Sequence, residues 1–147
     1  MTTVLAINGP NLNHLGARDP ALYGDKTLDE INGMVAARAE ALGLAPVFFQ
    51  SNSEGALVDF IQSHPEAAGI VINPGALTHY GYSLREALAD AALPTIEVHL
   101  SHIHAREEWR RVSVIAPVCR AQIGGVGWRG YLYALEALAE MLKEQGR

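Results

Sequence analysis

Two pairs of side chains in this sequence have the types and spacing needed for acid–base chemistry, and the first is Arg18 with Tyr23. Both lie in the segment 8–24, and connections of this length are often binding loops or lids. An ordinary tyrosine has a pKa of about 10 and is a poor base at neutral pH, but a neighbouring guanidinium favours the phenolate. Asn11 in the same segment offers an amide. The alternative is a solvated Arg18 and a Tyr23 that only attaches the loop to the body.

The second pair is Glu97 and His99, which lie two residues apart in an apolar, β-rich segment. The period of two in a strand places both side chains on the same face. A carboxylate beside a histidine fixes its tautomer and raises its basicity, so His99 is a candidate proton donor or acceptor. Because a buried glutamate needs a partner, a purely structural Glu–His pair is the alternative.

A possible anion-binding turn follows the apolar run that ends at Asn73. Gly75 and Ala76 permit backbone amides to approach a ligand closely, and such donors favour an anionic group such as a carboxylate. Asn73 and His79 could add side-chain hydrogen bonds. No Gly-Lys-Ser/Thr follows, so the turn is not a P-loop. The alternative is a structural turn with a capping histidine.

His99, His102 and His104 raise a metal-site hypothesis, which the sequence supports poorly. Their spacing crosses the faces of a strand, and no acidic or thiol ligand completes a familiar motif. We expect no metal, and surface or interface positions for His102 and His104. The three arginines of segment 106–111 should mostly form solvated or intersubunit pairs, although one aimed into a cleft could hold hydroxyls or a carboxylate.

Short strands must position these residues. Apolar, β-rich runs predict five of them, at Thr3–Asn8, Pro46–Gln50, Gly69–Asn73, Thr95–Leu100 and Ala121–Val126. The middle three are apolar at nearly consecutive positions, which is typical of strands buried on both faces.

Helical periodicity predicts the elements between the strands. Helices are expected at Thr27–Leu42, at Ala56–Ser63, from Ser83 through Ala91, and at about Tyr131–Lys143. Thr27 with Glu30, and Ser83 with Glu86, have the spacing of capping boxes.

This alternation predicts a three-layer αβα sandwich with a five-stranded parallel sheet, right-handed crossovers and a flavodoxin-like strand order. Residues 1–147 are expected to form a single domain. In open parallel sheets, ligands bind beyond the carboxyl ends of the strands, where the reactive residues of this chain lie. The fold class alone determines no function.

Composition excludes several classes of protein. The chain has 147 residues, of which 49% are hydrophobic and 18% charged, and its formal net charge is −5. No basic stripe exists, so nucleic acid is not an expected partner. One cysteine cannot form an internal disulfide. Without a signal peptide or an apolar run of about 20 residues, the expected partners exclude membranes and the expected compartment is the cytoplasm.

Taken together, the strand-end segments resemble those of the type II 3-dehydroquinate dehydratases along nearly the whole chain. No single fragment is decisive, but six occur in family order, and the ending 124–131 is similar too. The fragments are Asn8-Gly-Pro-Asn-Leu-Asn13, Arg18 with Tyr23-Gly24, Gln50-Ser-Asn-Ser-Glu54, Asn73-Pro-Gly-Ala-Leu-Thr-His79, Ile96-Glu-Val-His-Leu-Ser101 and Arg106-Glu-Glu-Trp-Arg110.

The resemblance implies a dehydration of 3-dehydroquinate to 3-dehydroshikimate that needs no metal or cofactor. The elimination is anti and passes through an enolate. By matched position, Tyr23 would remove the C2 proton, with Arg18 lowering the pKa of Tyr23 and holding the lid closed over the substrate. Asn11 would stabilise the enolate, through a bound water. His99 would protonate the departing C1 hydroxyl, with Glu97 orienting it.

The resemblance also assigns substrate contacts. Asn73 and the backbone amides of Leu100 and Ser101 would bind the substrate carboxylate, beside the Gly75–Ala76 turn. His79 and Arg110 would hold ring hydroxyls. The family assembles as trimers that form dodecamers, so a homo-oligomer is expected.

The chain departs from the family pattern at several positions. Glu86 stands where aspartate is usual, at a position that in the family reaches a neighbouring active site; a role in the Ser83 capping box is the alternative. The other departures are His102, Trp109 and the run Tyr80–Ser83. They put the subunit contact in doubt more than the chemistry.

Three rival functions remain at the level of sequence. One is a non-catalytic small-ligand or nucleotide-binding module, although the proline after Gly9 removes an amide that a phosphate turn would use. Another is a catalytically impaired paralogue that serves in an assembly, and the third is a metal-assisted hydrolase. No residue distinguishes aromatic biosynthesis from quinate breakdown, because both use this reaction.

Overall fold

A five-stranded, all-parallel sheet forms the centre of the computed structural model, which describes residues 1–146. The strand order is β2-β1-β3-β4-β5, the flavodoxin-like order that the sequence predicts. The strands are β1 (Thr2–Asn8), β2 (Leu44–Gln50), β3 (Gly69–Asn73), β4 (Thr95–His99) and β5 (Ala121–Gly124). Every residue of β3 and β4 is buried, which agrees with their continuous apolar character.

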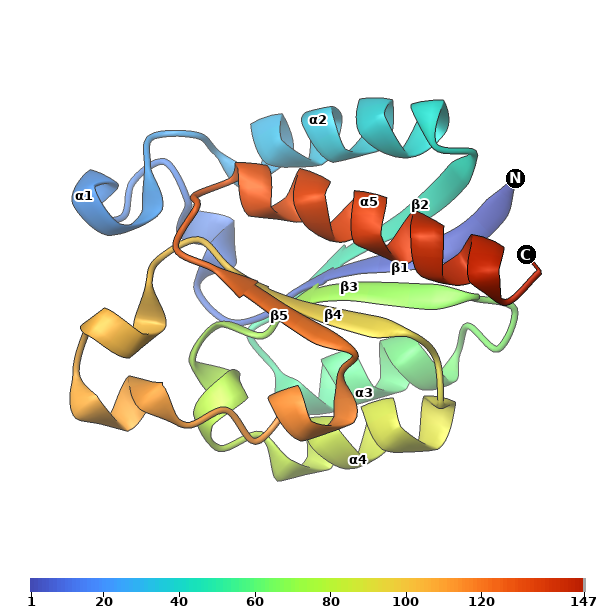
Figure 1. Ribbon diagram of the computed structural model, residues 1–147. Helices are drawn as coiled ribbons and strands as arrows, with labels where there is room; N and C mark the ends of the chain where they lie inside the picture. Colours follow the sequence, from blue (N-terminus) through green and yellow to red (C-terminus); the bar gives the residue numbers. More distant parts are fainter. Residues whose placement is uncertain (147) are drawn as a thin grey trace.

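Helices cover both faces of the sheet, so the chain has three layers (Figure 1). Helices α2 (Leu28–Ala41) and α5 (Arg129–Glu144) lie on one face, and α3 (Glu54–Gln62) and α4 (Tyr82–Ala91) on the other. A four-residue helix, α1 (Pro20–Tyr23), stands beyond the carboxyl ends of the strands. No helix within residues 1–146 is long and apolar enough to cross a membrane.

Two apolar cores separate the layers. One fills the space between the sheet and α2 with α5, and includes Ile31, Val35 and Leu138. The other lies beneath α3 and α4, and includes Leu57, Leu84 and Ile72. Since the strands between them carry side chains to both cores, the sheet edge that holds the reactive residues is supported from both sides.

The element boundaries differ from the predicted ones by one or two residues at most ends. Strand β4 ends at His99, and β5 at Gly124 instead of Val126. Strand β2 begins at Leu44 and contains Pro46, which an edge strand tolerates because one side of its backbone pairs with no strand. The capping box of Thr27 and Glu30 is present at the start of α2.

The predicted capping box of Ser83 and Glu86 is wrong. Helix α4 begins at Tyr82 after Gly81, so Ser83 already lies inside the first turn and does not cap it. Instead, the carboxylate of Glu54, at the start of α3, accepts a hydrogen bond from the backbone N–H of Leu84 at 3.0 Å. A carboxylate near a helix N-terminus also interacts favourably with the helix dipole.

The turns after β1 and β3 pack directly against each other. The backbone N–H of Gly9 donates to the carbonyl of Asn73 at 2.8 Å. A Cβ at Gly9 would lie 2.3 Å from the carbonyl oxygen of Pro74. Gly75 has φ +61°, and a Cβ there would lie 2.9 Å from the carbonyl oxygen of Pro10. Glycine at both positions therefore allows two loops of the site to meet.

We expect Gly9→Ala to destabilise the protein by about 1–3 kcal/mol, because the backbone at Pro74 must move to admit a methyl group. Urea unfolding measures the loss. The matched control is Gly33→Ala on the exposed side of α2, where no atom lies within 4 Å of the added carbon. That variant should gain about 0.5–1 kcal/mol from helix propensity. Equal effects of the two substitutions would contradict the packing argument.

Candidate active site

A small polar cleft opens beyond the carboxyl ends of β1, β3 and β4. Its volume is about 130 Å³. It is lined by Pro10, Asn11, Leu12, Arg18, Tyr23, Asn73, Gly75, Ala76, His79, His99, Leu100, Ser101, Ile103, Arg106 and Arg110. Most of the predicted site residues thus meet in one place.

The phenol of Tyr23 accepts hydrogen bonds from two guanidinium groups. Arg18 Nη2 donates to the phenol oxygen at 3.0 Å, and Arg106 Nη1 donates to the same oxygen at 2.9 Å. The guanidinium carbon of Arg18 also lies 3.9 Å from the centre of the ring. Two charged donors on one oxygen stabilise negative charge there. The expected pairing of Arg18 with Tyr23 is present.

Arg106 is a site residue to which the sequence reasoning gave no role of its own. Its Nη1 bridges Tyr23 and the hydroxyl of Ser101, at 2.9 and 3.0 Å. Its Nε is the one buried side-chain polar atom among residues 1–146 that lacks a hydrogen-bond partner. Arg106 lines the cleft, and its Nε lies 3.9 Å from a carboxylate oxygen of Glu107. The sequence feature that could have identified Arg106 as a site residue is its position in the motif Arg106-Glu-Glu-Trp-Arg110.

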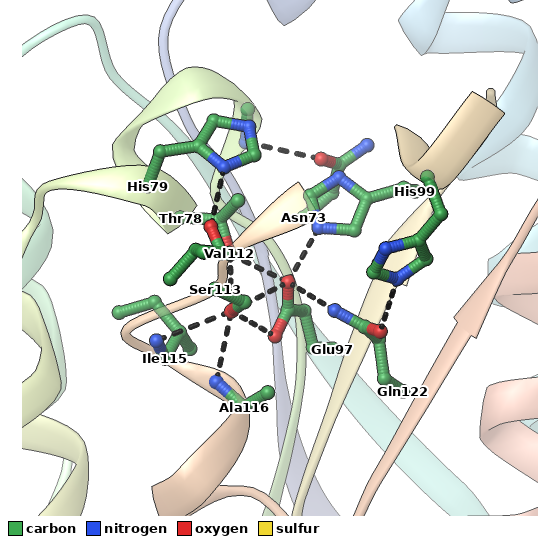
Figure 2. A network of polar contacts seen from close by, with 12 residues as sticks. Asn73, Thr78, His79, Glu97, His99, Val112, Ser113, Ile115, Ala116 and Gln122 are labelled. Carbon is green, nitrogen blue, oxygen red and sulfur yellow. Dashed lines mark hydrogen bonds and ion pairs between the residues drawn. The ribbon is translucent and has the colours of Figure 1, made fainter. Parts of the chain in front are cut away.

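The carboxylate of Glu97 is fully buried and accepts hydrogen bonds from four side chains (Figure 2). The donors are His99 Nε2 at 2.5 Å, Thr78 Oγ1 at 2.5 Å, Ser113 Oγ at 2.9 Å and Gln122 Nε2 at 3.0 Å. Burial alone would raise the pKa of Glu97, but the bond and charge of His99 and the bonds from Thr78 and Gln122 outweigh it. The pKa of Glu97 is therefore lowered, and the group is ionised at neutral pH.

These contacts determine which nitrogen of His99 faces the cleft. A carboxylate that accepts four hydrogen bonds has no proton to offer, so Nε2 of His99 must carry a hydrogen. Nδ1 is then the atom that can exchange a proton with a molecule in the cleft. The predicted pairing of Glu97 with His99 is present, and it has the orientation that acid–base chemistry requires.

Asn73 belongs to a buried network that was not foreseen from the sequence. Its Nδ2 donates to the hydroxyl of Tyr131 at 2.9 Å, and that hydroxyl donates to Asn8 Oδ1 at 2.6 Å. Burial raises the pKa of Tyr131 further above its ordinary value, so it stays a neutral donor. One N–H of the Asn73 amide is left over. The network connects β1, β3 and α5 beneath the cleft.

The turn after β3 differs in one respect from the expectation. The backbone N–H of Gly75 donates to Asn73 Oδ1 at 3.1 Å, so this amide is committed to the protein and not to a ligand. Ala76 still lines the cleft. His79 contacts the carbonyl of Val112 through Nδ1 at 2.7 Å, which leaves Nε2 as its free nitrogen (Figure 2).

His79 is electrostatically different from His99. Burial lowers the pKa of His79, the hydrogen bond to Val112 opposes this shift, and the charges of His99 and Arg110 add to it. The net direction is downward, so the ring is neutral at neutral pH. A neutral Nε2 can accept a hydrogen bond from a substrate hydroxyl.

Of the remaining predicted residues, four line the cleft and one, Glu86, does not. Asn11 adopts a left-handed conformation with φ 70°, and its backbone N–H donates to Asn52 Oδ1 at 3.0 Å. Arg110 lines the cleft while its Nε donates to Glu107 at 2.6 Å. Leu100 and Ser101 line it too. Glu86, by contrast, is exposed on α4 and is not part of the lining.

No group of three or more His, Cys, Asp or Glu side chains within residues 1–146 is arranged to hold a metal ion. His102 and His104 lie with ring centres 6.2 Å apart. His104 Nε2 reaches Gln122 Oε1 at 3.5 Å, and the residue is exposed, as expected.

The family described as Dehydroquinase class II matches residues 2–139 of this chain, which is most of its length. The chain belongs to this family. It is 58% identical over 136 residues to the 3-dehydroquinate dehydratase of Roseiflexus castenholzii, covering 92% of this chain and 87% of that protein. It is 52% identical over 145 residues to that of Halothermothrix orenii, covering 98% of each.

Solved structures agree with the class II dehydroquinase assignment. The crystal structure of type II dehydroquinase from Butyrivibrio crossotus aligns with a TM-score of 0.91 at 44% identity, covering 93% of this chain and 97% of that one. The predicted family and the predicted flavodoxin-like fold are confirmed. As a class II dehydroquinase, the chain is a hydro-lyase.

The pH dependence of stability provides a test of the buried carboxylate. Since the pKa of Glu97 is lower in the folded state, its ionised form stabilises the fold above about pH 4.5, and this stabilisation is lost as the pH falls through the lower folded value. Glu97→Gln should cost about 3 kcal/mol at neutral pH, because it leaves His99 and its other donors without a charged acceptor.

Urea unfolding between neutral pH and about pH 3.5 measures this difference, which should shrink on acidification. Glu140→Gln is the matched control, because Glu140 is exposed on α5 and pairs only with the exposed Lys143. It should change little at any pH. A deficit of Glu97→Gln that stays constant with pH would show that the lost stability is packing and not ionisation.

Proposed function

We propose that this dehydroquinase removes water from 3-dehydroquinate by an anti elimination through an enolate, with Tyr23 as the base and His99 as the acid. The observation that carries the division of labour is the pair of opposite environments in the cleft. Tyr23 is surrounded by cationic donors, and His99 is backed by a buried anion. Such a pair of groups is poised to accept one proton and donate another.

The base is the phenolate of Tyr23. Arg18 and Arg106 both donate to its oxygen, so negative charge there is stabilised before a substrate arrives. The phenolate takes the C2 proton of the substrate, and the electrons left behind form the enolate. Asn11, on the lining, stabilises the enolate oxygen by hydrogen bonding, through a bridging water.

The acid is His99. With Nε2–H held by Glu97, a second proton on Nδ1 faces the cleft, and the carboxylate stabilises the resulting imidazolium. The Nδ1 proton passes to the C1 hydroxyl, which leaves as water while the enolate collapses to the enone. The phenol and the imidazole then exchange protons with solvent to restore the starting state.

The other lining residues hold the substrate. The free N–H of Asn73 and the backbone amides of Leu100 and Ser101 bind the carboxylate beside Ala76. His79 accepts from one ring hydroxyl, and Arg110 donates to another. The guanidinium of Arg106, which lines the same cleft, adds positive charge beside the carboxylate.

We further propose that the enzyme works in the cytoplasm as a dodecamer built from four trimers, with Glu86 reaching a neighbouring active site. Glu86 and Tyr82 are exposed on α4, and Trp109 and Val112, which contact the cleft residue His79, are exposed apolar side chains, as is Tyr80. Subunit contacts would cover them. Light scattering should give a mass well above the 15.8 kDa of one chain. A monomer that turns over fully would reject the assembly.

Tyr23→Phe is expected to lower kcat by at least about 10²-fold with the fold retained, because no other group in the proposed mechanism takes the C2 proton. Turnover is followed by the absorbance of the conjugated enone product.

Arg106→Gln should lower kcat by about 10²-fold, since it removes one charged donor from the phenol oxygen. The exposed Arg120→Gln is the matched control and should leave kcat unchanged.

His99→Ala separates the two proton transfers. It should block elimination but leave exchange of the C2 proton with deuterated solvent, which NMR of the substrate detects. Tyr23→Phe should lose both. Exchange that survives in Tyr23→Phe would assign the base to another group. Folded wild-type protein without turnover of 3-dehydroquinate would instead favour a binding or assembly role for the chain.

A further inference from the structure

Gln122 reaches the Glu97–His99 pair from a strand that contributes nothing to the cleft. It lies on β5 directly beside Glu97 in the sheet register, and its Nε2 donates to Glu97 Oε2 at 3.0 Å. Figure 2 shows its amide turned toward the Glu97 carboxylate. Gln122 is not among the residues that line the cleft.

We propose that Gln122 is a positioning residue for the general acid: it fixes the Glu97 carboxylate against His99 and closes the edge of the sheet over it. The inference rests on the proposed function of His99. Gln122 does not touch the reacting atoms, so its effect on turnover passes through Glu97.

The orientation of the amide is determined by chemistry. A carboxylate only accepts hydrogen bonds, so the nitrogen of the Gln122 amide must face Glu97 and its oxygen must face outward. The outward oxygen lies 3.5 Å from His104 Nε2. His99, Thr78 and Gln122 all donate to Oε2 of Glu97, so the amide is one of three donors that together hold this oxygen in place.

Glu97 and Gln122 differ sharply in solvent exposure. Glu97 has 0% exposure, whereas Gln122 is exposed at the open edge of β5. The Gln122 side chain therefore stands between solvent and the buried carboxylate. Of the other two donors, Thr78 is fully buried and Ser113 also accepts from the backbone N–H groups of Ile115 and Ala116. Gln122 is the donor that can be changed with least damage to the fold.

The titratable groups that face Glu97 are few. They are His99 on its own strand, His79 on the helical turn η2 (Gly75–His79) and Cys119 after the turn η5 (Ala116–Val118). Arg110 acts on His79 from the cleft rim. The pKa of Cys119 is raised to about 12 by burial and by the charge of Glu97, so the thiol does not titrate near neutral pH. Loss of the Gln122 amide changes the environment of the carboxylate and, beyond it, only the long contact with the exposed His104.

Gln122→Met tests the proposal, because it keeps the length of the side chain and removes the donor. We expect kcat to fall about tenfold with KM unchanged, a fraction of what a general acid contributes. The acidic limb of the kcat profile should move to higher pH, since a carboxylate with one donor fewer is protonated more easily. Gln122→Glu places a second carboxylate there and should move the limb further in the same direction.

The matched control is Gln62→Met, which makes the same change at an exposed position on α3. It should leave kcat, KM and the pH profile at wild-type values. The Glu97 carboxyl carbon, followed by NMR against pH, gives a readout that needs no turnover. Its titration midpoint should rise in Gln122→Met.

The proposed function and the proposed role of Gln122 would be contradicted by different results. If wild-type protein does not turn over 3-dehydroquinate, the proposed function is lost, while the carboxyl titration still reports on Gln122. If wild type turns over but Gln122→Met changes neither the pH profile nor the titration, Gln122 is only a surface side chain and the inference is overturned. A rise in KM at constant kcat would equally contradict it, because it would place Gln122 in substrate binding.

Discussion

An ionised carboxylate with no exposed surface lies in the middle of β4, and much of the site is arranged to make that burial tolerable. A buried charge without partners would be costly, so Glu97 is stable only because four donors from four separate parts of the chain converge on it. These donors come from β4, β5, the turn after β3 and the segment before η5. The need to satisfy one carboxylate thus fixes the relative positions of several loops and the tautomer of His99.

A second constraint couples the neighbouring strand ends. The turns after β1 and β3 are in contact at Gly9 with Pro74 and at Gly75 with Pro10, which leaves no space for a Cβ. Beneath them, the hydroxyl of Tyr131 joins Asn8 and Asn73. Backbone contact between the turns and buried hydrogen bonds beneath them hold the carboxyl ends of β1 and β3 together. Tyr23 and Arg18 approach these strand ends from the outer part of the same connection between β1 and α2.

Much of the fold and part of the candidate site could be predicted from the sequence. Continuous apolar runs determine buried parallel strands, and the period of two places Glu97 and His99 together, so the fold and that pair follow from local patterns. Arg18 and Tyr23 lie in one short segment, so their contact could also be predicted. Contacts between distant segments were not: Arg106 meets Tyr23 across 83 positions, and Tyr131 meets Asn8 across 123.

The error at Ser83 has a similar origin. The spacing of Ser83 and Glu86 satisfies the local rule for a capping box, but the helix starts one residue earlier because Glu54, from another helix, binds the amide of Leu84. A tertiary contact thus decided a boundary that a local rule could not. Gly75 was likewise predicted for its amide, whereas its φ and its approach to Pro10 explain the residue.

The arrangement around Tyr23 also has a thermodynamic consequence. Its phenol oxygen is bound both by Arg18 of its own loop and by Arg106 from the segment after β4, so one oxygen atom attaches the loop to the rest of the site. Docking of the loop and the position of Arg106 are therefore linked equilibria, and each must favour the other by the same free energy. A ligand that holds Arg106 in its present position would also favour the docked loop, without touching the loop itself.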